Sequence, residues 1–445
     1  MKKPLILLLI FLSILLNRPF NTTAYAEQLA EREIFPSGIT LLHSEKKALP
    51  IVTVVMAIKA GSVVEPHEKA GLANLAADLL NEGTSRRTSK KISDEIEFVG
   101  GSLSTSGGSD YITVSLTVLK KNLELGFDLL SDIILNPSFN QDEINRRKKV
   151  IKSAIIQQNE EPGIVASKAF SKAVFGVHPY GRPVEGTLET LDNISRQDIV
   201  DFHSSYYSPN NTIMAVVGDI DKEQLKSSID KYFKNWKKKE INFPDMPFPK
   251  SGGRAEVIKI NKNITQANII LGHLGIKRDD PDYYAVSVMN YILGGGGFAS
   301  RLMDNIRDNK GLSYDVHSSF SASKYSGSFQ VGLQTKNNSA NQAINEILKE
   351  MDRIRTETVS DKELDNAKLY LTGSFPLRID SNRKIAAFLI AVEFYDLGLD
   401  YADDYKKFIE AVSKNDILRI AKKYLDTRNY ILVIVGDIEK AVLEY

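Results

Sequence analysis

The side chains that most often hold a catalytic metal are scarce in this chain. It has no cysteine and six histidines, at positions 43, 67, 178, 203, 273 and 317. No two histidines lie four residues apart, so H-E-x-x-H and H-x-x-E-H are both absent. Those motifs work because residues four apart share a helix face, where two imidazoles meet one zinc ion beside a glutamate. A Gly-x-Ser-x-Gly elbow is also absent, so the sequence offers no evident nucleophile.

Arg307 and Tyr314 are the polar pair whose spacing is most informative. The pattern predicts a helix over 299–309, with a core stripe of Leu302, Met303 and Ile306. Gly311 then supplies a left-handed cap, and 312–317 reads as a strand. Arg307 and Tyr314 are therefore expected to meet at the helix-to-strand corner. The alternative is an arginine on a solvated face and a tyrosine packed in a sheet.

Four consecutive glycines, Gly294, Gly295, Gly296 and Gly297, precede the predicted helix. No Lys-Ser/Thr follows them, so they do not form a phosphate-binding loop of the P-loop type. Backbone without side chains can still approach a ligand closely. A ligand-contacting loop and a flexible turn are both compatible with this run.

An internal repeat organises the elements around these residues. The Gly-Asp pair at 218–219 recurs at 436–437, each time after a run of apolar residues. At the same offset, Ser195 and Ser413 each precede a helical pattern, where a serine hydroxyl can accept from free backbone N–H groups. Two matches at one offset predict tandem domains of similar fold.

Length and composition agree with two domains. The chain has 445 residues, whereas single cores usually stop growing at about 250. A charge run, three prolines and a glycine pair mark a linker at 237–253, between domains at 27–236 and 254–445. A net charge of +1 gives no electrostatic footprint for nucleic acid.

Alternating apolar residues predict strands at 50–58, 111–118 and 267–274, and a helical period covers 71–81. Clean alternation is typical of a sheet with one polar face, as in largely antiparallel sheets covered by helices on one side. The predicted class is therefore α+β in each domain.

The N-terminus has the pattern of a secretory signal. Lysines precede an apolar run from Pro4 to Leu16, and Ala24-Tyr-Ala26 offers a small-x-small cleavage site. The run is shorter than the roughly 20 residues that a spanning helix needs. We expect residues 1–26 to be removed, which would leave an exported, soluble chain without a permanent membrane anchor, periplasmic if the cell has two membranes.

The segment 61–84, Gly-Ser-Val-Val-Glu-Pro-His to Asn-Glu-Gly-Thr, resembles the zinc-site segment of the pitrilysin/insulinase family, the inverzincins, which includes the mitochondrial processing peptidase. The resemblance places Asn74 and Asp78 at the family's two histidine positions and Ala77 at its glutamate. It places Ala154 at the third metal ligand. All four positions are substituted, so this chain is expected to hold no metal and to activate no water. The simplest interpretation puts Asn74 and Asp78 on a solvated helix face.

The resemblance continues through the stretch that begins at His178, whose side chain is expected to cap or pack. In the second domain, the family carries an arginine and a tyrosine with the spacing of Arg307 and Tyr314, and a glycine-rich loop where 294–297 lies. The resemblance implies that this pair supports substrate and transition state, since guanidinium and phenol groups can donate to an oxyanion.

From this resemblance we expect the chain to be the non-catalytic, substrate-binding subunit of an exported heterodimeric zinc metalloendopeptidase that degrades or processes peptides. Its partner would share the fold, carry H-x-x-E-H and hold the zinc. The alternative is a zinc-free protein of the same fold that binds peptides or assembles a complex.

Overall fold

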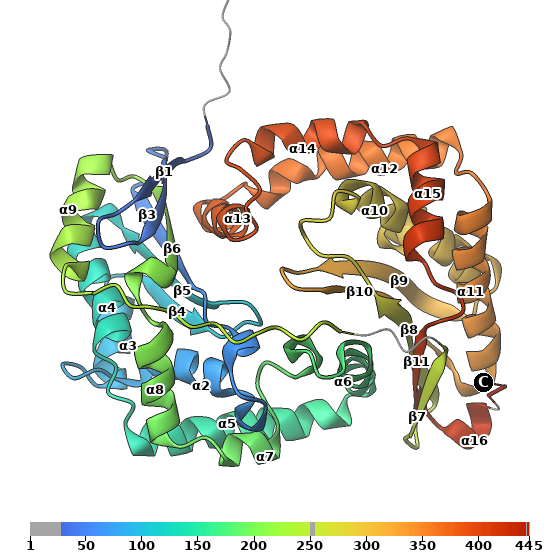
Figure 1. Ribbon diagram of the computed structural model, residues 1–445, viewed down its shortest axis with the longest axis horizontal. Helices are drawn as coiled ribbons and strands as arrows, with labels where there is room; N and C mark the ends of the chain where they lie inside the picture. The colour runs from blue at the N-terminus through green and yellow to red at the C-terminus, as the bar shows by residue number, and fades with distance from the viewer. Residues whose placement is uncertain (1–27, 250–253, 442, 445) are drawn as a thin grey trace, which may run out of the picture.

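The computed structural model describes residues 28–249, 254–441 and 443–444, arranged as two sheet-and-helix halves that face each other (Figure 1). The predicted signal peptide, 1–26, lies outside the described residues, as does 250–253 of the predicted linker. Within the described part, no helix is long and apolar enough to cross a membrane.

The first half contains a six-stranded sheet. Its strands lie in the order β1 (Glu31–Ile34), β2 (Thr40–Glu45), β6 (Thr212–Gly218), β3 (Ile51–Ile58), β5 (Ile112–Leu119) and β4 (Ser102–Ser106). Its helices are α2 (Leu72–Leu79), α3 (Ser89–Phe98), α4 (Leu123–Leu135), α5 (Gln141–Glu160), α6 (Pro162–Phe175), α7 (Leu188–Asp192), α8 (Arg196–Tyr206) and α9 (Lys222–Phe233).

The second half contains a five-stranded sheet. Its strands lie in the order β7 (Glu256–Asn261), β11 (Ile431–Gly436), β8 (Gln266–Leu274), β10 (Gly327–Lys336) and β9 (Ser313–Ala322). Its helices are α10 (Tyr283–Asn290), α11 (Ala340–Thr356), α12 (Asp361–Gly373), α13 (Asn382–Phe394), α14 (Tyr401–Glu410), α15 (Lys414–Tyr424) and α16 (Ile438–Ala441).

The two sheets share one topology, which confirms the α+β class with two similar, largely antiparallel units. The repeated segment forms β6 in the first sheet, parallel to β2 and antiparallel to β3. It forms β11 in the second, parallel to β7 and antiparallel to β8. Ser195 and Ser413 cap α8 and α15 as expected, each in a reciprocal pair of hydrogen bonds with the aspartate three residues later.

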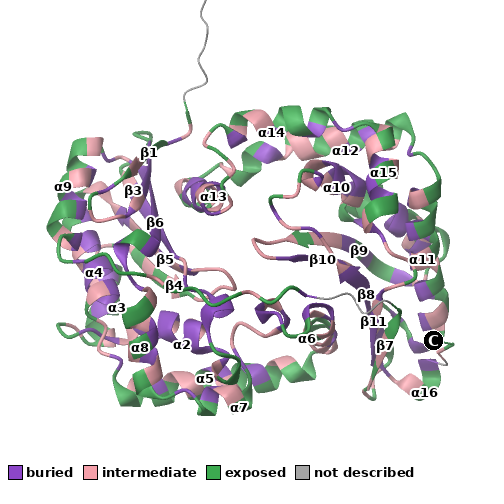
Figure 2. Ribbon diagram, viewed as in Figure 1, coloured by how far each residue is buried: buried purple, intermediate pink, exposed green. Residues whose placement is uncertain are grey.

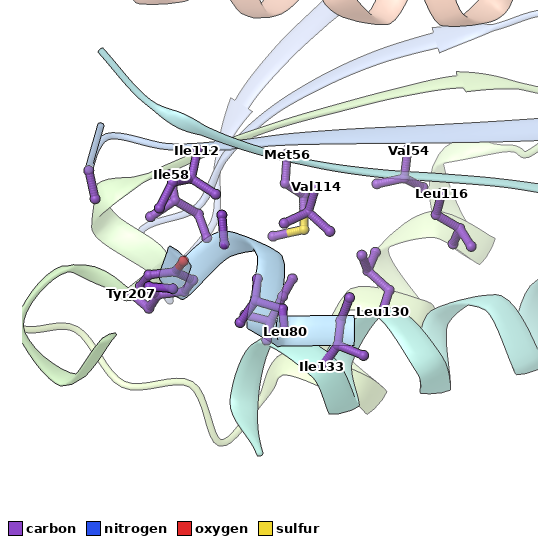
Figure 3. Packing of buried hydrophobic residues seen from close by; sticks show 14 of the residues in the cluster. Val54, Met56, Ile58, Leu80, Ile112, Val114, Leu116, Leu130, Ile133 and Tyr207 are labelled. Carbon is purple, nitrogen blue, oxygen red and sulfur yellow. The ribbon is translucent and has the colours of Figure 1, made fainter. Parts of the chain in front are cut away.

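Helices bury one face of each sheet. In the first half, Val54, Met56 and Val114 point from the strands toward Leu130 and Ile133 of α4 (Figure 3). Every side chain in this group is fully buried. Such burial contributes about 1.5–3 kcal/mol to the free energy of unfolding for each large aliphatic side chain.

A helix from the other half covers part of the opposite face of each sheet, so that face is polar only in part. Strand β5 keeps the predicted alternation, with half-buried Thr113, Ser115 and Thr117 between buried apolar residues. Helix α13 packs Leu389 and Ile390 against Val55 and Ala215 of the first sheet. Helix α6 packs Phe170 and its neighbours against the second sheet. Figure 2 shows the resulting buried strands beside α13. Helices α6 and α13 thus each pack on the sheet of the other half. Because each lies far in sequence from the strands that it covers, no local pattern indicates this packing.

The halves also meet at the tips of their hairpins. The Tyr180 hydroxyl donates to the half-buried Asp110 carboxylate, beside Lys324 of the β9–β10 connection. Burial raises the pKa of Asp110, while Tyr180 and Lys324 oppose that shift. On the other side, Arg32 donates twice to Glu393 of α13, each time over 2.8 Å. These contacts hold the two halves in one arrangement.

Candidate functional site

Helix α2 is fixed at its N-terminus by a buried carboxylate. Gly71 has a φ of 97°, a left-handed conformation that favours glycine. Backbone N–H groups of Gly71 and Ala73 donate to Glu65 over 2.9 Å each. These N–H groups have no partner within the helix, so Glu65 satisfies them. Burial raises the pKa of Glu65 to about 8, against the opposing effect of these donors and of Arg182.

Asn74 and Asp78 do not lie on a solvated face, contrary to the sequence-based interpretation, because both are half-buried. Ala77 is fully buried, and the Asp78 side chain is only 14% exposed. Arg147 Nε of α5 donates to Asp78 Oδ2 over 3.0 Å. Asn74 lies against Gly107, where a Cβ would come within 2.6 Å of the Asn74 Cα. This surface of α2 is therefore occupied by the rest of the first half.

These residues do not fit a zinc ion. Asn74 offers a neutral amide, Ala77 a methyl group, and Asp78 a carboxylate already paired with Arg147. Ala154 is exposed and lies two helical turns beyond Arg147. Among the described residues, no group of three or more His, Cys, Asp or Glu side chains could hold a metal.

His178 has the structural role expected of it. It is buried, and its Nδ1 accepts from the backbone N–H of Tyr180 over 3.1 Å. This bond caps the short helical turn Pro179–Gly181.

The glycine run differs from the prediction. Gly294 and Gly295 belong to a π-helical turn, Tyr291–Gly295, rather than to a loop. Gly294 is buried, and a Cβ there would lie 2.5 Å from Ser318 Oγ, so its lack of a side chain serves packing against β9. Gly297 is exposed with a φ of 55°, and nothing would meet a Cβ there. Gly295 is also exposed and Gly296 is half-buried, so Gly294 is the one glycine of the run that is closed to a ligand.

The helix predicted over 299–309 is also π-helical, over Met303–Asn309. Its stripe is as predicted, since Leu302, Met303 and Ile306 are buried. Gly311, with a φ of 60°, caps the segment by donating to the Arg307 carbonyl. Wider turns of this kind occur often at functional sites, and apolar spacing does not distinguish them from α-helix.

The structure brings Arg307 and Tyr314 together at this corner. The Arg307 guanidinium carbon lies 5.2 Å from the centre of the Tyr314 ring and 4.6 Å from that of Phe298. Tyr314 is 86% exposed and Phe298 is 70% exposed. The carboxylate paired with Arg307 is Asp308, at 3.5 Å. Two exposed rings thus flank an arginine whose side chain is 27% exposed.

Tyr314 also lines a cavity of about 420 Å³ between α6 and the second sheet. Gly163, Ala166 and Ser167 of α6 form one wall. Strand residues form the other wall: Gln266, Asn268, Ile269, Ile270, Asp315, His317, Gln330, Gly332, Leu333 and Gln334. No local pattern indicates that these amide side chains share a cavity, because residues from both halves meet only through helix α6.

Fold and site together define a two-domain protein whose described residues include no set of side chains suited to hold a metal. Its sequence matches the family model "Insulinase (Peptidase family M16)" over residues 41–188 and "Peptidase M16 inactive domain" over 193–371. The chain belongs to the insulinase, or M16 peptidase, family, as its zinc-site segment suggested.

Several relatives match most of the chain. An uncharacterised zinc protease of Rickettsia felis is 27% identical over 396 residues, or 87% of this chain and 93% of its own. One of Mycobacterium leprae is 30% identical, over 67% of this chain and 68% of its own. The non-peptidase homologue YmxG of Helicobacter pylori is 25% identical over 93% of this chain and 96% of its own.

Solved structures share the fold. A peptidase M16 inactive domain from Pseudomonas fluorescens superposes with a TM-score of 0.85 and 28% identity, covering 92% of this chain and 98% of its own. A Helicobacter pylori protease gives a TM-score of 0.85 at 21% identity, over 91% and 99% of the two chains. The match to an inactive-domain model and the substituted metal positions support a non-catalytic member of the family.

Proposed function

We propose that this protein is the substrate-binding subunit of an exported heterodimeric metallopeptidase. The observation that carries the proposal is the partly exposed Arg307 held between Phe298 and Tyr314, beside a cavity that Tyr314 lines. Guanidinium and phenol groups placed in this way can donate to a peptide carbonyl and to the oxyanion that forms from it. The open end of the glycine run, at Gly297, lies next to Phe298 in the chain and would allow a peptide backbone to approach.

The proposed partner has the same fold, carries H-x-x-E-H and supplies zinc and the activated water. This division of labour follows from the contrast within the chain, whose metal positions are substituted while its arginine–tyrosine corner is intact. The predicted signal peptide, residues 1–26, would direct export of the chain. In a cell with two membranes the chain would then be periplasmic.

The test is to capture the tagged chain from its native extract, identify co-eluting chains by mass spectrometry, and assay zinc and peptide hydrolysis. We expect a partner of similar size with H-x-x-E-H, together with zinc and activity. Arg307→Ala and Tyr314→Phe should leave capture intact and lower turnover. Elution of this chain without such a partner, and without activity, would overturn the proposal.

A second candidate is a zinc-free protein that binds peptides or assembles a complex. It is favoured by the likeness to a relative named as a non-peptidase homologue, which matches 93% of this chain. This candidate predicts peptide binding or a structural partner without hydrolysis in any pairing, so the same capture experiment separates the two.

A further inference from the structure

The cavity between α6 and the second sheet presents an unusual set of hydrogen-bonding groups. Gln330 and Gln334 lie on one face of β10, and Asn268 of β8 pairs directly opposite Gln334. The alternate residues Phe329 and Val331 point into the core. The strand pattern therefore presents amide groups to the cavity and apolar groups to the core.

These amides have unused hydrogen-bonding capacity. A primary amide has two donor hydrogens and one acceptor oxygen. Asn268 Nδ2 is buried and has no hydrogen-bond partner. The side chains of Gln330 and Gln334 make no hydrogen bond to any residue that the structure describes. A buried amide without a hydrogen-bond partner is energetically unfavourable. A polar ligand that hydrogen-bonds to the Asn268 amide would therefore bind more tightly.

The charge of the cavity narrows the class of ligand. Its ionisable lining groups are Tyr314, Asp315 and His317, and the His317 Nδ1 lies 3.2 Å from the Asp315 carboxylate. The lining contains one carboxylate, which the His317 ring contacts, and no Lys or Arg, so it has no cluster of charges to hold an ionic ligand. The site therefore favours a neutral ligand that is rich in hydrogen-bonding groups.

The arrangement of the amides favours an extended chain. Gln330 and Gln334 are four residues apart on one strand, which corresponds to about 13 Å. The volume of about 420 Å³ lies within the range of about 300–1,000 Å³ typical of ligand sites. We propose that this cavity binds an extended, uncharged polar segment of a polypeptide, rich in Asn, Gln or Ser, through Asn268, Gln330 and Gln334. This inference rests on the proposed function and names the class of peptide that it takes.

The test measures anisotropy of fluorescein-labelled 12-residue peptides with the purified chain. One peptide is rich in Ser, Asn and Gln, and its counterparts carry Leu, or Glu and Lys, at the central positions. We expect the neutral polar peptide to bind about tenfold more tightly than either counterpart. The double variant Gln330→Leu, Gln334→Leu should bind the neutral polar peptide about tenfold more weakly than the wild type does. Gln157→Leu, on the exposed surface of α5, is the matched control.

The outcomes separate this inference from the proposed function. Equal binding of all three peptides, or a preference that persists in the double variant, overturns the inference alone. Failure of the wild-type chain to bind any peptide overturns both. If the wild type binds maltohexaose and the double variant does not, the cavity is a carbohydrate site and the peptide assignment is overturned. Gln334→Leu alone, at an exposed position, gives the same readout if the double variant does not fold.

Discussion

The two halves of this protein share a topology, but the polar side chains at their candidate site positions differ in what they contact. In the first half, Asp78 is paired with Arg147 and Glu82 with Arg146, so these carboxylates have cationic partners inside the half. In the second half, Arg307 rests on exposed aromatic rings, and its carboxylate contact is an adjacent residue at 3.5 Å. Carboxylates that are paired within the fold stabilise it, whereas an arginine without so close a partner can still donate to a ligand.

Loss of the exposed pair should have the largest effect. Combined Arg307→Ala and Tyr314→Phe changes are expected to lower turnover of the captured complex about 100-fold, because removing a donor to an oxyanion costs that much. Thermal unfolding should be unchanged, since Tyr314 is 86% exposed. Arg383→Ala, also exposed and also in the second half, is the matched control. Wild-type turnover in the double variant would remove the pair from the mechanism.

The paired carboxylate of the first half makes the opposite prediction. Arg147→Met should destabilise the protein by about 1–3 kcal/mol, because it leaves the largely buried Asp78 without its donor. Adding Asp78→Asn should recover part of this loss, and peptide binding should not change. Urea unfolding of the wild type, both single variants and the double variant gives the coupling energy. A coupling near zero would show that the pair is incidental.

A restored metal site would sharpen the comparison further. Combined Asn74→His, Ala77→Glu, Asp78→His and Ala154→Glu changes recreate the family's donor set. Arg147 would remain as a positive charge beside that set, so we expect zinc to bind at least about tenfold more weakly than when Arg147→Ala is added. Isothermal titration with zinc measures the difference. Equal affinity in the two variants would show that Arg147 does not oppose a metal.

The smallest expected effect lies at the contact between the halves. The folded pKa of Asp110 is raised, chiefly by burial, so the native state holds this proton more tightly than the unfolded chain does. Its contribution to stability is therefore present at low pH and is lost as pH rises through the folded pKa. Relative to Asp110→Asn, the wild type should gain stability between pH 7 and pH 4. A difference that stays constant over this range in urea unfolding would contradict the assignment.

Local sequence patterns predicted what depends on neighbouring residues. The patterns that follow Ser195 and Ser413 predict helix caps, since a hydroxyl accepts from N–H groups within the next turn. Gly311 was recognised as a left-handed cap, and it places Arg307 against Tyr314. The π-helical geometry of Met303–Asn309 was not predicted, because its apolar stripe is also compatible with α-helix.

The pairing of side chains far apart in sequence could not be predicted. Asp78 and Arg147 are 69 residues apart, and nothing near either residue indicates the other. Their separation explains why a solvated helix face was expected where the structure has an ion pair.

By itself, the sequence determined the tandem repeat, the α+β class, the loss of the metal donors and the arginine–tyrosine corner, because each depends on residue types and short spacings. The tertiary structure alone decided that α6 and α13 cover the opposite sheets and that Asn268, Gln330 and Gln334 line a cavity with α6. Those arrangements depend on long-range packing of apolar surface, which is non-directional and carries no local signal.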